Sequence, residues 1–143
     1  AADTAFGKAA RAFRTAAKTA ARERKRAACL SARQDADAAR DRAIQAGATE
    51  LAATELKRAT ESFVAGERAL ATENFSGSEA DFRKANDAFE IGMRYTFHKQ
   101  GFDGARIEAL VDVARGMASG SVKTAAEIHE CMVPHVLAAQ YKK

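Results

Sequence analysis

The chain of 143 residues has no tryptophan, a single proline and only two cysteines. Proline is the residue that most strongly breaks helices, and Pro134 leaves all of the chain before it free to form them. Two cysteines are too few for a disulfide scaffold, although they permit one bridge. No apolar run approaches the roughly 18 residues of a membrane span, so no transmembrane segment is predicted.

Sequence motifs of common enzymes are absent as well. The chain has no Gly-x-x-x-x-Gly-Lys-Ser/Thr loop for phosphates and no Gly-x-Gly-x-x-Gly turn for dinucleotides. The His-Glu-x-x-His zinc-protease motif fails at residues 129–133, where valine stands in place of the second histidine. No two carboxylates stand out from their sequence neighbours as a buried catalytic pair. We therefore expect no enzymatic activity and name no catalytic residues.

Three histidines are the only side chains suited to acid–base chemistry near neutral pH. His98 follows a phenylalanine at the expected end of a helix, where a positive charge favours the negative end of the helix dipole. His135 lies four residues after Cys131, a spacing that puts both on one face of a regular helix. A zinc site needs three or four ligands and no further ligand is evident, so we expect no bound metal.

The chain is rich in alanine, leucine, arginine, lysine and glutamate, which are strong helix formers. Apolar residues recur with helical spacing in five stretches: 3–46, 49–74, 78–101, 103–120 and 121 onward, the last with a kink near Pro134. Connections of two to four residues make neighbouring helices antiparallel. The predicted fold is all-α, an antiparallel bundle of four or five helices whose first helix is long, basic and rich in alanine.

The expected helix boundaries rest on short polar residues. Ser78 followed by Asp81 resembles a capping box after a turn at residues 75–78, and Asp103 precedes the next apolar repeat. No glycine or proline interrupts the first helix after residue 7. That helix is therefore predicted either to run unbroken to residue 46 or to break near residues 30–31.

Charge and alanine are distributed unevenly along the chain. Residues 1–46 hold 18 of the 36 alanines and 11 of the 23 lysines and arginines, against 5 acidic residues. Residues 47–143 hold 12 basic and 14 acidic residues, together with almost all of the larger apolar side chains. We predict two parts: a basic, alanine-rich helical arm at 1–46 and a helical bundle body at 47–143.

The arm has a stripe of small apolar residues and a dense positive charge. Phe6, Phe13 and Ala20 recur every seven residues, and such a stripe buries little area per turn. Between Lys8 and Arg33, nine basic residues face Glu23 alone, so the arm can bind phosphates, anionic lipid or an acidic protein face. The basic residues predicted to bind a partner are Arg11, Arg14, Lys18, Arg22, Arg24, Lys25 and Arg26.

Larger apolar residues at helical spacing predict the core of the body. These residues are Leu56, Phe63, Leu70, Phe82, Phe89, Met93, Leu110, Val111, Met117, Ile128 and Leu137. In an oxidising compartment, Cys29 and Cys131 could form a disulfide that ties the first helix to the last helix of the body. In a reducing compartment both are expected to remain buried thiols.

Two segments resemble the helices of peridinin–chlorophyll proteins. One runs from Glu108 through Val122-Lys-Thr-Ala-Ala-Glu-Ile-His129, and the other is Ala80-Asp-Phe-x-x-x-Asn-x-Ala-Phe89. The resemblance implies that His129 would hold a chlorophyll through a water molecule. It also implies a photosynthetic, thylakoid-lumen setting.

The expected function is that of a non-catalytic accessory subunit of a larger, membrane-associated assembly. The basic arm would dock it on a partner with an acidic surface or anionic lipid, and no cofactor beyond the chlorophyll implied by the resemblance is expected. The alternative is a nucleic-acid-binding helical protein that uses the same arm, driven by phosphate contacts and sensitive to salt. An organelle lumen is the expected location, or the cytoplasm or nucleus if the cysteines are reduced.

Overall fold

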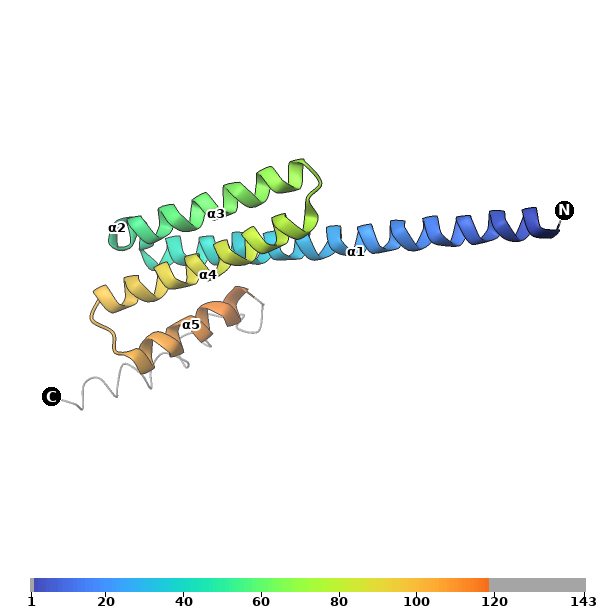
Figure 1. The fold of residues 1–143 in the computed structure, drawn as a ribbon. Helices are drawn as coiled ribbons and strands as arrows, with labels where there is room; N and C mark the ends of the chain where they lie inside the picture. Colours follow the sequence, from blue (N-terminus) through green and yellow to red (C-terminus); the bar gives the residue numbers. More distant parts are fainter. Residues whose placement is uncertain (1, 119–143) are drawn as a thin grey trace.

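The computed structural model describes residues 2–118 and contains five helices there (Figure 1). They are α1 (Ala2–Ala46), α2 (Ala48–Leu51), α3 (Ala53–Ala71), α4 (Phe75–Lys99) and α5 (Gly104–Ala118). No strand occurs within these residues. The prediction of an all-α bundle is confirmed.

The helices run back and forth beside one another, and α4 lies at the centre of the bundle. It packs against the C-terminal half of α1, against α3 and against α5, while the N-terminal half of α1 projects beyond the other helices (Figure 1). The reversals are tight: Gly47, at φ 99°, ends α1, and Glu73, at φ 57°, lies in the turn before α4. Within the described residues, no helix is both long and apolar enough to cross a bilayer.

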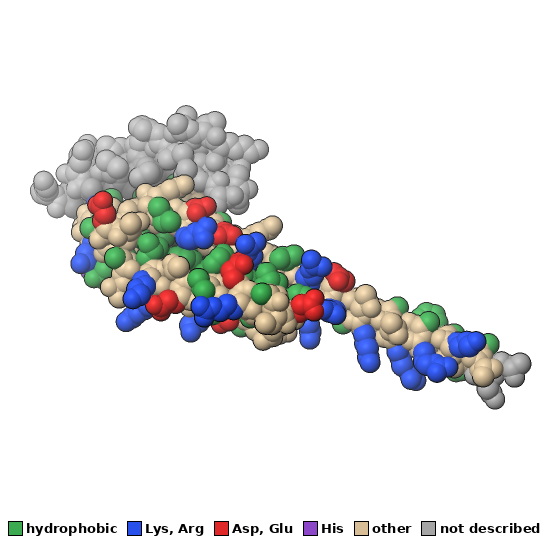
Figure 2. All heavy atoms as spheres, turned by 90° about the horizontal axis from the view of Figure 1, so that it is seen from above, with side chains coloured by type: hydrophobic (Ala, Val, Ile, Leu, Met, Phe, Trp, Pro, Cys, Tyr) green, Lys and Arg blue, Asp and Glu red, His purple; other side chains and the backbone are tan. Residues whose placement is uncertain are grey.

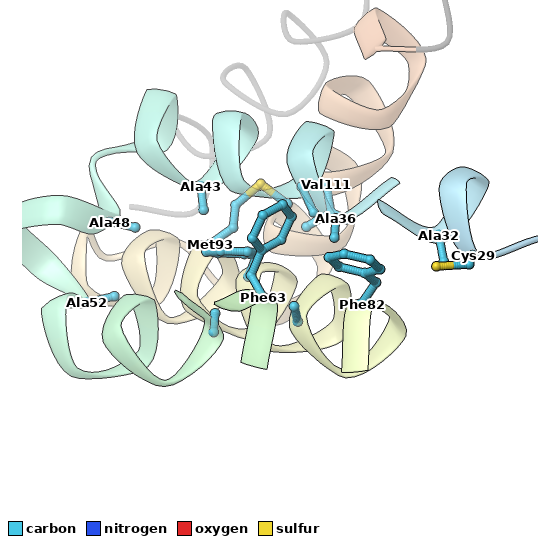
Figure 3. Packing of buried hydrophobic residues seen from close by; sticks show 14 of the residues in the cluster. Cys29, Ala32, Ala36, Ala43, Ala48, Ala52, Phe63, Phe82, Met93 and Val111 are labelled. Atoms are coloured by element: carbon cyan, nitrogen blue, oxygen red, sulfur yellow. The ribbon is translucent and has the colours of Figure 1, made fainter. Parts of the chain in front are cut away.

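Small residues on α1 let the large side chains of α4 come close to its backbone. Ala36 and Ala43 are fully buried, and so are Phe82 and Val111 (Figure 3). Phe89 is fully buried as well. Each fully buried phenylalanine or valine contributes about 1.5–3 kcal/mol. The rest of the buried apolar set is Cys29, Ala32, Ala39, Ala48, Ala52, Ala59, Phe63, Phe75, Ala85, Met93 and Ile107.

A glycine on α3 makes room for one ring of this core. The rings of Phe63 and Phe82 meet edge to face, with centroids 5.1 Å apart. A Cβ atom added at Gly66 would lie 2.8 Å from the Phe82 ring, which is closer than van der Waals contact allows. The position therefore needs a residue without a side chain.

The predicted core is confirmed for Phe63, Phe82, Phe89, Met93 and Val111, which are all buried. Three leucines of that prediction are partly exposed. Leu56 and Leu70 pack against the core, and Leu110 is the third. The side chain of Met117, together with Ile128 and Leu137, falls outside what the structure describes. The prediction missed the alanines of α1, because methyl groups carry little weight in a hydrophobic pattern.

The start of α4 differs from the predicted capping box. The helix begins at Phe75, and its cap is Asn74, whose side chain accepts a hydrogen bond from the Gly77 amide at 3.1 Å. Ser78 is instead fully buried and donates a hydrogen bond to the Gly66 carbonyl oxygen at 2.7 Å. A serine that finds an acceptor on a neighbouring helix no longer has to serve as a cap.

The other predicted boundaries have mixed outcomes. Helix α1 runs unbroken through residues 30–31, whereas the second predicted helix is divided at Ala52, at φ −136°, into α2 and α3. Asp103 caps α5 as predicted, because its carboxylate accepts a hydrogen bond from the Arg106 amide at 2.9 Å. The predicted helix after residue 121 and its kink near Pro134 lie outside the described residues.

Candidate docking surface

The two halves of α1 differ in burial although they belong to one helix. Every side chain from Arg11 to Ala27 is exposed, and burial begins at Cys29. The change therefore falls at the middle of α1, whereas the predicted division between arm and body falls at residue 46. We use the name arm from here on for residues 2–28, a rod about 40 Å long at 1.5 Å per residue.

The basic residues of the arm occupy the positions that alanines occupy in the core. Arg11, Lys18 and Lys25 follow one another at intervals of seven and continue into Ala32 and Ala39, which are buried under α4. Residues seven apart lie on nearly the same face of an α-helix. The positive charges of the arm thus extend the face of α1 on which the body packs.

A second row repeats this arrangement. Arg22 precedes Cys29, Ala36 and Ala43 at the same interval of seven, and these three residues are fully buried. We call the exposed residues Arg11, Arg14, Lys18, Arg22 and Lys25 the basic stripe. Cations in place of small apolar residues are costly to bury, so the close packing of α3 and α4 on α1 ends where the basic stripe begins.

The opposite face of the arm is apolar. Phe6 and Phe13 are 79% and 77% exposed, and Ala9, Ala16 and Ala20 share their side of the helix. In Figure 2 most of the basic side chains of the arm project from one edge, and hydrophobic side chains lie along the other. This apolar face carries no charge from residue 5 to residue 22.

The seven residues predicted to bind a partner are all exposed, but they do not share one face. Five of them form the basic stripe, and Arg26 lies at its edge. Arg24 follows Ala10 and Ala17 at intervals of seven, which places it on the apolar side of the arm. Arg24 therefore lies apart from the basic stripe, and whether the seven residues bind a partner stays a prediction.

Most charges of the basic stripe are uncompensated. Arg22 pairs with Glu73 across the turn before α4, and its guanidinium lies 6.0 Å from the centroid of the Phe75 ring. Within residues 2–118, Arg14, Lys18 and Lys25 form no ion pair. Exposed cations without partners attract anions at long range, and salt screens that attraction.

A groove marks the end of the basic stripe nearest the body. It has a volume of about 580 Å³ and lies between Lys18, Arg22 and Lys25 on one side and the turn at residues 72–76 on the other. The three cations line one wall, and Glu73 neutralises only one of them. An anionic group that followed the basic stripe toward the body would reach this groove.

Directly after the arm, α1 is joined to the body by a buried hydrogen bond and an ion pair. The Cys29 thiol donates to the Ser78 hydroxyl at 3.1 Å, and that hydroxyl donates to the Gly66 carbonyl oxygen. Arg33 on α1 also pairs with Glu67 on α3. Cys29 is a free thiol in the structure, Cys131 lies outside the described residues, and the disulfide between them stays a prediction.

The body contains a cluster of charges of a different kind. Glu90 on α4 is 12% exposed and lies between three arginines: Arg115 at 2.7 Å, Arg94 at 3.6 Å and Arg42 at 3.7 Å. Burial alone would raise the pKa of Glu90, but the hydrogen bond from Arg115 and the three positive charges together lower it. This cluster joins α1, α4 and α5.

Sequence reasoning missed both the Cys29–Ser78 contact and the Glu90 cluster. The spacing of Glu90 and Arg94 is a recognisable helical ion pair. The other partners of Glu90, Arg42 and Arg115, come from different helices. A single sequence carries no signal for contacts between helices.

Two observations concern ligand and metal binding by the described part of the body. A hollow of about 540 Å³ is lined by Arg42, Met93, Phe97 and Ala114 among others. A terminal nitrogen of Arg42 pairs with Glu90 at 3.7 Å, whereas the buried Nε of Arg42 has no hydrogen-bond partner among the described residues. In the described part of the chain, no group of three or more His, Cys, Asp or Glu could hold a metal ion. His98 lies in the last turn of α4 as predicted, and His129, the residue that the resemblance points to, is outside that part.

Comparison of the chain with protein-family models, curated proteins and solved structures finds no match.

Proposed function

We propose that this protein is a non-catalytic accessory subunit that docks through its arm on an anionic partner in a larger assembly. The observation that carries the proposal is the register of α1. The same face of one helix that presents alanines to the body presents unpaired cations along the arm. A surface of this charge is complementary to phosphates, lipid headgroups or an acidic protein face.

Two largely buried groups among the described residues are engaged in contacts of the fold. Its clustered carboxylate, Glu90, is held by three arginines, and its buried thiol, Cys29, is hydrogen-bonded to Ser78. Such groups stabilise a fold. The arm is the part of α1 that the described helices do not cover, and the proposal places the functional surface there.

The test is incorporation into native complexes in the cells that produce the protein. A variant with Arg11, Arg14, Lys18 and Lys25 changed to Glu is compared with a control variant in which four exposed body residues, Lys57, Arg58, Arg68 and Lys84, are changed to Glu. The arm variant is expected to move from large complexes to the free fraction in a density gradient, most clearly at low salt. Unchanged sedimentation of the arm variant at low salt would refute the proposal.

Nucleic acid is the second candidate partner, because the arm is a single exposed helix and the DNA major groove admits one helix. Binding would rest on phosphate contacts, so affinity for duplex DNA should fall steeply with salt and show little dependence on base sequence. Filter binding of the full chain at several salt concentrations measures this. The photosynthetic setting implied by the resemblance has its own test, a pigment absorption band in the protein purified from its natural source.

A further inference from the structure

The proposed docking function uses only the basic stripe and leaves the opposite face of the arm unexplained. Phe6 and Phe13 are among the most exposed large apolar side chains in the described chain, whereas Phe82 and Phe89 are fully buried. A single exposed apolar residue is ordinary, but two on one uncharged helical face form an apolar patch of the kind that marks an interaction site. The partner should therefore offer anionic groups to the basic stripe and an apolar environment to the opposite face.

We infer that the anionic partner is a lipid bilayer surface, on which the segment from residue 5 to residue 22 lies with Phe6 and Phe13 inserted between the headgroups. This inference rests on the proposed docking function and names its partner. A helix with Lys and Arg on one side and Phe on the other, and with few large apolar residues in all, is the kind that lies in the plane of a membrane interface. The apolar face enters the boundary between headgroups and acyl chains, and the long cationic side chains reach the phosphates.

The placement of charge along the arm fits this partner. From residue 4 to residue 22 the arm has no acidic residue, and Lys8 and Arg14 lie toward the two edges of the apolar face. Each Lys or Arg near an anionic leaflet strengthens binding about fivefold. A purely acidic protein face or a nucleic-acid backbone would use the cations and leave both phenylalanines in water.

The position of the body also leaves the apolar face open. Helices α3 and α4 pack on the side of α1 that the basic stripe extends, which is the side away from Phe6 and Phe13. Farther along α1, the acidic residues Asp35 and Asp41 appear on the side that the apolar face occupies in the arm. Anionic lipid repels these carboxylates, so the contact ends near the junction and the body remains above the surface.

The absence of tryptophan supplies a clean reporter for insertion. Phe13→Trp places the only indole of the full chain on the apolar face, and Thr15→Trp places it on the basic side as a matched control. With vesicles of phosphatidylcholine and phosphatidylserine in equal amounts, Phe13→Trp should shift its emission to the blue and be quenched by brominated acyl chains. Thr15→Trp should show little of either effect.

Binding to the same vesicles by sedimentation measures the energetics. Replacing Phe6 and Phe13 together with Ala should weaken partitioning about a hundredfold, since each buried ring contributes roughly tenfold. The control Ile91→Ala removes an exposed apolar residue from the body and should leave partitioning unchanged. Pure phosphatidylcholine vesicles should bind the wild-type chain far more weakly, because they carry no net charge.

Three outcomes would overturn the inference in different ways. If the arm binds vesicles or duplex DNA through its charges but the emission of Phe13→Trp does not move, insertion is rejected and the proposed docking function stands. If that emission shifts without vesicles as protein concentration rises, the apolar face pairs with a second copy of the chain. If the full chain binds no vesicle, DNA or polyglutamate at low salt, the proposed docking function fails as well.

Discussion

The two halves of α1 have the same secondary structure and a similar alanine content, yet one is buried and the other is exposed. The difference lies on one face of the helix. Ala36 and Ala43 present methyl groups there, and Lys18 and Lys25 present ammonium groups on the same side in the arm. Alanine content by itself therefore does not decide whether a helix joins a core; the residues on the face toward the neighbouring helix do.

The strongest test of this comparison is to give the buried half the chemistry of the arm. Ala36→Arg places a cation and a long side chain where the exposed fraction is zero, beneath α4. The cost should be about 5 kcal/mol or more, enough to unfold the protein, because the charge is unpaired and the site has no room. Chemical denaturation followed by circular dichroism measures it. Ala12→Arg in the arm is the matched control and should change stability by less than about 0.5 kcal/mol.

The second comparison concerns phenylalanine in the two regions. Phe89 is fully buried and Phe13 is 77% exposed, so the same substitution should have different effects. Phe89→Ala should lower the free energy of unfolding by about 3–5 kcal/mol, through lost burial and the cavity left behind. Phe13→Ala should leave it within about 0.5 kcal/mol. A loss below that limit for Phe89→Ala would remove Phe89 from the core.

Paired and unpaired charges make the third comparison. Glu90 has a pKa below that of the unfolded chain, so its pairing stabilises the fold above about pH 4.5, and this contribution is lost as the pH falls through the lower folded-state pKa. Glu90→Gln should cost about 2 kcal/mol at pH 7, less than a fully buried pair because Arg115 reaches solvent.

The pH dependence separates this effect from a simple loss of packing. In urea titrations from pH 7 to pH 3, the Glu90→Gln protein should lose less stability on acidification than the wild type. Glu61→Gln, an exposed carboxylate without an ion pair in the described residues, should reproduce the wild-type curve. Equal acid sensitivity of the Glu90→Gln protein and the wild type would show that the cluster does not carry the pH dependence.

The smallest expected effect contrasts two glycines, and its sign should reverse between them. Gly66→Ala brings a Cβ atom to 2.8 Å from the Phe82 ring and should destabilise by about 1–2 kcal/mol. Gly7→Ala meets no atom within 4 Å and lies inside α1, so it should increase helix stability by about 0.5–1 kcal/mol. Thermal unfolding and the helical signal at 222 nm measure the two changes.

The sequence predicted well where side chains were large or patterns were long. The all-α class, the unbroken option for α1, the Asp103 cap and the aromatic core all follow from helical spacing. The burial of Ala32 and Ala39 could not be predicted in this way, because alanine occurs on exposed helix faces nearly as readily as on buried ones. The cap at Asn74 was also missed, since the choice between Asn74 and Ser78 depends on Gly66, a residue on another helix.

The candidate site was predictable in composition and only partly in geometry. Nine basic residues between Lys8 and Arg33 already indicated a docking surface. The division of the arm into a basic stripe and an apolar face depends on where the body sits around α1, which a single sequence does not reveal. That placement sets Arg24 apart from the basic stripe and puts Phe6 and Phe13 on the face opposite to it.

The continuity of α1 across the junction has a mechanical consequence. From residue 8 to residue 46 no glycine or proline offers a hinge, so the arm and the rest of α1 form one stiff helix. A sideways load on the tip becomes a torque about the Cys29–Ser78 contact, with a lever of about 40 Å. Helix α1 should tilt as one rigid unit without bending. A partner that holds the N-terminal end of the arm therefore also sets the angle and the distance of the body relative to that partner.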